Sequence, residues 1–191
     1  MSYVAKDYTH LLGMEGFSDT LLKNHFTLYQ GYVANTNKLM ETMGAMLQEG
    51  KQAAPEFAEL KRRFGWEFNG MRLHELYFEN LGGDGDPSKA PMLALKVMQQ
   101  FGSVEACVAD FTATATMRGI GWVVCYLDPD SGLLLNTWIN EHDVGHPAGL
   151  TPLLVLDVFE HAFMIDYGLK RADYLASFMK NLKWEAVAAR L

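Results

Sequence analysis

The chain has 191 residues, of which 49% are hydrophobic and 20% are charged. This balance excludes a disordered chain and is typical of a globular protein, built as one large domain or two small ones. The net charge of −7 is spread along the sequence and argues against nucleic acid as a partner, because phosphate binding needs a concentrated basic face.

Cysteine usage and hydropathy indicate a cytoplasmic protein. Cys107 and Cys125 each lie inside an apolar run, and no Cys-x-x-Cys motif occurs. Residues 1–10 are polar and lack the core of a signal peptide, and no apolar run approaches membrane-spanning length. We therefore expect a reducing compartment and no membrane partner.

The first half of the chain has the periodicity of helices. Ser18 and Asp19 can cap a long helix that begins at residue 20, and Gly50 ends it. Two further helical stretches are expected over residues 55–64 and 69–81. The Gly- and Asp-rich stretch that follows, residues 82–87, is the strongest breaker in the sequence. It sets the predicted domain boundary, with domains at residues 1–86 and 87–191.

The second half mixes helices with strands. In chain order, the patterns predict helices over residues 88–100 and 103–117, strands over 120–127, 133–140 and 150–156, and closing helices over 159–167, 171–179 and 184–191. The turn at residues 128–132 is of hairpin type. The predicted fold class is α+β: a long N-terminal α-hairpin domain precedes a C-terminal α/β domain with a small, three-stranded antiparallel sheet.

An ionisable pair stands at the end of the buried strand. Asp157 and His161 are four residues apart, so they share a face if the backbone is helical, and they can also converge where an extended segment turns into a helix. Burying such groups costs free energy unless each is bonded to something. Taken alone, the pair also fits a helix-capping Asp beside a hydrogen-bonded core His.

The helical half supplies further candidates. His25, Tyr29 and Tyr32 follow one another at helical spacing on the first helix, and His74 lies on the apolar face of a later one. Either histidine alone could be a satisfied core residue. Together with Asp157 and His161, they offer three imidazoles and a carboxylate, a set that suits iron, manganese or zinc.

The segment from Asp157 to Phe163, Asp-Val-Phe-Glu-His-Ala-Phe, resembles the Asp-x-Trp-Glu-His-Ala-Tyr signature of the iron/manganese superoxide dismutases. The likeness extends along most of the chain and includes some archaeal-like features. The other segments that carry it are Tyr-Val-Ala-Asn at residues 32–35, Leu-His-Glu-Leu-Tyr at 73–77, Gly-Ile-Gly-Trp at 119–122, Arg-Ala-Asp-Tyr at 171–174 and Asn-Leu-Lys-Trp at 181–184.

The resemblance implies a function and a set of site residues. His25, His74, Asp157 and His161 would bind one Fe or Mn ion per subunit, with solvent as a fifth ligand. Tyr32 would be the gateway residue, hydrogen-bonded toward that solvent. The implied reaction is dismutation of superoxide to oxygen and hydrogen peroxide. Glu160 would bridge to the partner subunit's His161 in a homodimer, or in a tetramer.

The family also places a hydrogen-bonding Gln near the metal, on the second ligand helix or in the sheet region. Gly70 is too small to serve on the helix, so the sheet region is expected to supply the group near Glu141 and His142. Archaeal members can have a histidine there, and with His146 further on this favours His142. An exposed loop histidine is the alternative.

Several positions depart from the family pattern. The family spacing on the first helix is His-x-x-x-His-x-x-x-Tyr, whereas Tyr32 follows Tyr29 by only three residues. We hypothesise that this helix lacks the one-residue π-bulge of the family, so that a regular helix presents His25 and Tyr32 together. In the family, a tyrosine after the Glu-His pair usually meets a first-helix histidine of the neighbouring subunit. Met164 and Tyr29 stand at these two positions here, which suggests that the pair was replaced together. Three family tryptophans are replaced, by Phe78, Val124 and Phe159.

Two other functions fit the same residue types. A degenerate member of the fold could serve a structural or interaction role without redox activity. However, a scaffold has little reason to keep buried titratable groups that need partners. A zinc hydrolase is the weaker alternative, because the four ligands already fill a tetrahedral zinc site and no general base is evident.

Overall fold

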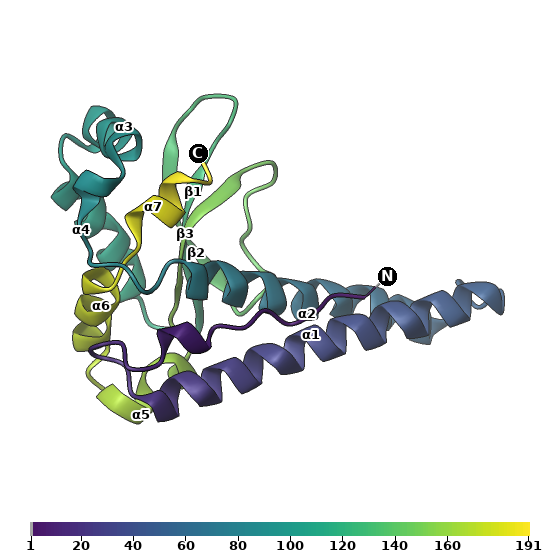
Figure 1. Cartoon of the computed structure of the whole chain (residues 1–191). Coiled ribbons are helices and arrows are strands. Elements are labelled where there is room, and N and C mark those ends of the chain that lie inside the picture. Colours follow the sequence, from purple (N-terminus) through teal and green to yellow (C-terminus); the bar gives the residue numbers. More distant parts are fainter. Residues whose placement is uncertain (1) are drawn as a thin grey trace.

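Two long helices form an N-terminal hairpin that projects from the rest of the molecule (Figure 1). They are α1 (Asp19–Gln48) and α2 (Pro55–Glu79), in a computed structural model that describes residues 2–191. Ser18 caps α1, since its Oγ accepts a hydrogen bond from the Leu21 N–H at 3.1 Å. Gly50 follows the helix in the left-handed region at φ +71°, where the chain turns back.

α2 is one continuous helix, so the expected break between residues 64 and 69 is wrong. Pro55 occupies its first turn, where a missing N–H costs nothing. Gly65 and Gly70 each weaken a helix by only about 1 kcal/mol relative to Ala. Burial of the apolar face of α2 against α1 and the C-terminal sheet outweighs that cost.

The C-terminal part is built on a three-stranded antiparallel sheet, as predicted, and the strand order is β2-β1-β3. The strands are β1 (Gly121–Leu127), β2 (Leu134–Asn140) and β3 (Thr151–Asp157). The central strand β1 is buried along nearly its whole length, because α4 packs against β1 and β2 while α2 packs against β3. This explains why β1 reads as a continuous apolar run.

The helices of this part surround the sheet. They are η2 (Pro87–Lys89), α3 (Pro91–Phe101), α4 (Val104–Ala115), η3 (Glu160–Ala162), α5 (Met164–Tyr167), α6 (Arg171–Lys180) and α7 (Trp184–Ala188). The single helix expected over residues 159–167 is wrong. Phe163 leaves the helical region at φ −144° and splits the segment into η3 and α5.

The segment between the two predicted domains is held by the C-terminal end of the chain. The N–H groups of Gly83 and Gly85 donate to the carbonyls of Asn181 and Leu182, each at 3.0 Å. A Cβ on Gly83 would lie 2.4 Å from the Leu182 carbonyl oxygen, so only glycine allows this approach. The boundary between residues 86 and 87 stays a prediction.

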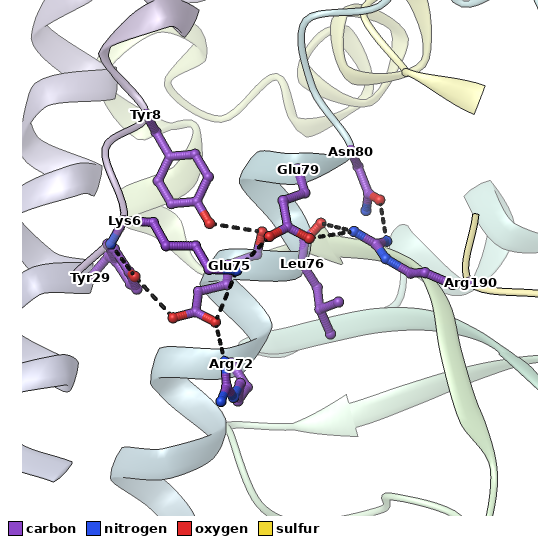
Figure 2. A network of polar contacts seen from close by, with 9 residues as sticks. All are labelled: Lys6, Tyr8, Tyr29, Arg72, Glu75, Leu76, Glu79, Asn80 and Arg190. Carbon is purple, nitrogen blue, oxygen red and sulfur yellow. Dashed lines mark hydrogen bonds and ion pairs between the residues drawn. The ribbon is translucent and has the colours of Figure 1, made fainter. Parts of the chain in front are cut away.

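A polar network joins the N-terminal segment to both long helices and to the C-terminal end (Figure 2). At its centre is Glu75, whose carboxylate accepts hydrogen bonds from the Tyr29 hydroxyl at 3.0 Å and from Arg72 at 2.6 Å. The Lys6 N–H donates to the Tyr29 oxygen, and the Lys6 ammonium pairs with Glu79 at 2.7 Å. The network fixes the stretch of α2 that carries His74.

Within residues 2–191, each helix is too short or too polar to cross a membrane.

Candidate metal centre

Four side chains from four elements meet between the hairpin and the sheet. His25 comes from α1, His74 from α2, Asp157 from the end of β3 and His161 from η3, and one donor atom of each lies within 4.8 Å of the others. The Oδ2 atom of Asp157 is central. It lies 3.1 Å from His25 Nε2, 3.0 Å from His161 Nε2 and 3.6 Å from His74 Nε2.

The chain path after β3 brings Asp157 and His161 together. Asp157 is the last residue of the strand, and its Oδ1 accepts the Phe159 N–H at 2.8 Å. This bond turns the chain, and the single 3₁₀ turn of η3 then returns His161 to the same carboxylate. The pair therefore converges through a strand-to-helix turn and not on one face of a helix.

Burial and the contacts among these groups together set their charge. His25, His74 and Asp157 are fully buried, whereas the His161 side chain is 29% exposed. Burial lowers the pKa of His74 well below its usual value and also lowers the pKa of His25, although Asp157 opposes the shift at both residues. Burial acts to raise the pKa of Asp157, but His161 and His25 together hold it well below its usual range.

The hydrogen bonding of His74 fits a cation. Its Nδ1 lies 2.5 Å from the Gly70 carbonyl oxygen, which can only accept, so the proton is on Nδ1 and Nε2 carries a lone pair. That Nε2 atom is buried, faces the Asp157 carboxylate and has no hydrogen-bond partner within residues 2–191. A buried lone pair opposite a carboxylate is costly unless a cation lies between them. Three imidazole nitrogens and one carboxylate oxygen are ligands that a first-row transition metal accepts.

A second pair of side chains lies beside these four. The Tyr32 hydroxyl and His142 Nε2 are 2.7 Å apart, and the Tyr32 ring stacks on His74 with centroids 5.2 Å apart. The Trp122 Nε1–H donates to His142 Nδ1 at 3.0 Å. Because an indole nitrogen can only donate, the proton of neutral His142 is on Nε2 and points to the Tyr32 oxygen.

Burial keeps both of these groups neutral. It lowers the pKa of His142 to about 4 and raises the pKa of Tyr32 to about 12. Across the physiological range, Tyr32 therefore keeps its proton and His142 gains no second one.

The backbone of α1 confirms the hypothesis of a regular helix. Every residue from Asp19 to Gln48 is α-helical, and this helix places both His25 and Tyr32 on the side of the cluster. Glu141 and His142 are the two candidates for the position of the family's hydrogen-bonding Gln. Of these, His142 lies beside Tyr32.

The paired replacement of Tyr29 and Met164 is wrong. Tyr29 is 1% exposed within the chain itself, and its hydroxyl is bonded to Lys6 and Glu75 (Figure 2). It therefore cannot face a neighbouring subunit. The three-residue step from Tyr29 to Tyr32 turns Tyr29 toward the N-terminal segment.

Two contributions to the site are not predicted by the sequence. The Gly-Ile-Gly-Trp pattern does not reveal that Trp122 donates to His142. The small size of Gly70 does not reveal that the Tyr32 ring fills the space beside it. Both depend on contacts between segments far apart in the chain.

Comparison with known proteins places the chain in a family. Residues 89–190 match the model of the C-terminal domain of iron/manganese superoxide dismutases. A relative from Aquifex pyrophilus, named superoxide dismutase [Fe], is 37% identical over 97% of this chain and 89% of its own length. Two archaeal relatives are each 34% identical. One, from Haloferax volcanii and named superoxide dismutase [Mn] 2, aligns over 87% of this chain and 82% of its own length. The other, from Saccharolobus solfataricus and named superoxide dismutase [Fe], aligns over 85% and 79%.

The chain therefore belongs to the iron/manganese superoxide dismutase family. The donor set alone suits iron, manganese or zinc, and membership of this family leaves iron and manganese.

Proposed function

We propose that His25, His74, Asp157 and His161 bind one Fe or Mn ion and that the protein dismutates superoxide at this centre. The observation that carries the proposal is the single buried carboxylate oxygen surrounded by three imidazole nitrogens. Membership of the family supports the reaction, which converts two superoxide ions and two protons to oxygen and hydrogen peroxide. A bound ion supplies the one-electron chemistry, by alternating between its divalent and trivalent states.

Tyr32 and His142 are proposed as the catalytic residues that handle protons. The Tyr32 hydroxyl and the His142 Nε2–H form a 2.7 Å hydrogen bond next to the ligands. Burial keeps both groups neutral, and the Trp122 donor places the His142 proton on Nε2. Peroxide formation consumes protons, so a donor held at a fixed position lowers its barrier. Trp122 holds His142 in the tautomer that donates toward Tyr32.

Aromatic rings restrict water around this pair. The His142 ring contacts Trp66 edge-on with centroids 5.0 Å apart and stacks on Phe159 at 4.8 Å. These contacts keep bulk water from the hydrogen-bonded pair.

We also propose that the protein is a cytoplasmic homodimer or tetramer. Glu160 is exposed in the single chain and directly precedes His161, whose side chain is 29% exposed. A carboxylate at this position can accept a hydrogen bond from the partner subunit's His161. Cys107 and Cys125 are buried thiols that are not joined in a disulfide, which suits a reducing compartment. The domains are proposed to be residues 1–86 and 87–191.

The test combines elemental analysis with a superoxide-consumption assay. The purified protein should contain stoichiometric Fe or Mn and consume superoxide. His25→Ala should lose both, because it removes one of the four donors. His10→Ala is the matched control, since His10 is exposed and away from the cluster. A fully metallated, active His25→Ala protein would contradict the ligand assignment, and wild-type protein without metal or activity would favour a structural role.

A further inference from the structure

The loop that carries His142 is exposed and leaves β2 through an unusual backbone conformation. Glu141, at the start of the loop, has φ +52°, a left-handed value that non-glycine residues rarely adopt. Asp143, Val144 and Gly145 are exposed to solvent. A short bridge between Asn140 and Val144 closes the base of the loop. This bridge leaves the carbonyl group of His142 outside the sheet.

His146 binds that carbonyl group. Its Nε2 lies 2.9 Å from the His142 carbonyl oxygen, and its Nδ1 lies 2.7 Å from the Tyr126 hydroxyl. Because a carbonyl can only accept, the proton of neutral His146 is on Nε2 and its Nδ1 accepts from Tyr126. Tyr126 lies on β1 and is 3% exposed, and burial raises its pKa to about 12, so its hydroxyl keeps the proton that it donates.

His142 is thus held at two points by the same strand. Trp122 binds its ring directly, and Tyr126 binds its backbone through His146. Both anchors are buried residues of β1, the central strand of the sheet. The ring and the backbone of His142 are therefore both fixed relative to the central strand of the sheet.

We propose that Tyr126 and His146 are positioning residues, which hold His142 within hydrogen-bond distance of Tyr32. This role deepens the proposed function, because it matters for catalysis only if His142 serves there. We call the two hydrogen bonds that link Tyr126 through His146 to the His142 carbonyl the relay. Without the relay, the His142 carbonyl can turn to water and the loop can move. The Nε2 atom of His142 would then no longer be kept 2.7 Å from the Tyr32 oxygen.

Three substitutions in the full chain test the relay. Tyr126→Phe removes one oxygen atom and leaves the ring, whereas His146→Phe removes both hydrogen bonds of the imidazole. His146→Gln is the conservative variant, because an amide can donate to the carbonyl and accept from Tyr126. Tyr3→Phe is the control, since it removes a tyrosine hydroxyl from the N-terminal segment, where the Tyr3 ring packs against Phe68.

The first measurement is hydrogen exchange of the Trp122 indole N–H, followed by NMR. This proton reports on His142 directly, because its acceptor is His142 Nδ1. We expect exchange to be about tenfold faster or more in Tyr126→Phe and His146→Phe. His146→Gln and Tyr3→Phe should exchange like the wild type.

The second measurement is superoxide consumption per bound metal ion. We expect a loss of about threefold to tenfold in Tyr126→Phe and His146→Phe at unchanged metal content, with recovery in His146→Gln. If His146→Phe does not fold, Tyr126→Phe decides the question.

Unchanged indole exchange in Tyr126→Phe would overturn the proposal, as would faster exchange that His146→Gln fails to restore. Faster exchange in a protein that consumes no superoxide, even as wild type, would support the relay and refute the proposed function instead.

Discussion

The ring of Tyr32 occupies the space where a side chain on Gly70 would stand. A Cβ added at position 70 would lie 2.5 Å from Cδ1 of Tyr32 and 2.7 Å from Cε1, well inside van der Waals contact. The same glycine provides the carbonyl that accepts from His74 Nδ1. One position on α2 therefore sets both the place of Tyr32 and the orientation of a proposed ligand.

Gly70→Ala should reduce superoxide consumption by about tenfold or more, because the displaced Tyr32 ring can no longer hold its hydroxyl against His142. The helix itself gains from alanine, so any loss of activity would arise from the clash. Gly65→Ala on the same helix is the control: no atom lies within 4 Å of the added Cβ. It should raise the free energy of unfolding by about 0.5–1 kcal/mol and leave activity intact. Full activity in Gly70→Ala would contradict the steric argument.

Glu75→Gln should lower the free energy of unfolding by about 1–3 kcal/mol, measured by urea denaturation. Glu75 is 4% exposed and accepts from both Tyr29 and Arg72, and a neutral amide cannot satisfy these donors as a carboxylate does (Figure 2). Glu59→Gln is the corresponding change at the ion pair of Glu59 with Arg62, in which both side chains are more than two thirds exposed. Its loss in the free energy of unfolding should stay within about 0.5 kcal/mol. Equal losses in the two variants would show that burial of Glu75 does not matter.

The free energy of unfolding should decrease as the pH is lowered below about 6.5, in part because of His142. Its pKa is lowered from 6.5 to about 4 in the folded protein, so the unfolded chain binds more protons between these values. Folding is then penalised as the pH falls through this window, and the contribution of His142 between pH 7 and 5 is about 2 kcal/mol. His25 and His74 shift in the same direction and add to the effect.

His142→Gln should therefore lose less stability than the wild type between pH 7 and pH 5, by roughly that amount. Urea denaturation of chelator-treated protein at both pH values measures the difference and keeps metal release out of the comparison. Identical losses for the two proteins would show that His142 is not buried in its neutral form.

Glu160→Ala should weaken subunit association. If Glu160 accepts a hydrogen bond from the partner subunit's His161, its removal should raise the dissociation constant by at least about tenfold. Analytical ultracentrifugation over a range of concentrations measures this constant. Glu105→Ala, which changes an exposed acid in the first turn of α4, should associate like the wild type. A dissociation constant that does not move in Glu160→Ala would remove this residue from the interface.

Most of the fold could be predicted because each element follows its own periodicity and caps. Ser18, Gly50 and Ser103 mark helix ends that the structure confirms within one or two residues. The two failures have opposite causes. The segment around Gly65 looked like a break although tertiary packing keeps the helix intact. Residues 159–167 looked like a helix, although the Asp157 side chain binds the backbone and redirects the chain.

The four clustered side chains could be predicted because their residue types are unusual in apolar surroundings and the motif at Asp157 is specific. Their immediate support could not be predicted. The donor to His142 is Trp122, 20 residues away along the chain, and the neighbour of Gly70 is Tyr32, 38 positions earlier. Such contacts depend on how the hairpin packs on the sheet, and a single sequence carries no local signal for them.

The free end of the α1–α2 hairpin offers a place to modify the protein (Figure 1). Tyr32 lies 16 residues before the last residue of α1, Gln48, a separation of about 24 Å along the helix axis. The connecting residues around Gly50 are exposed. An affinity tag, a fluorophore or an immobilising linker inserted there would be carried by a rigid arm, with its attachment point far from the chemistry.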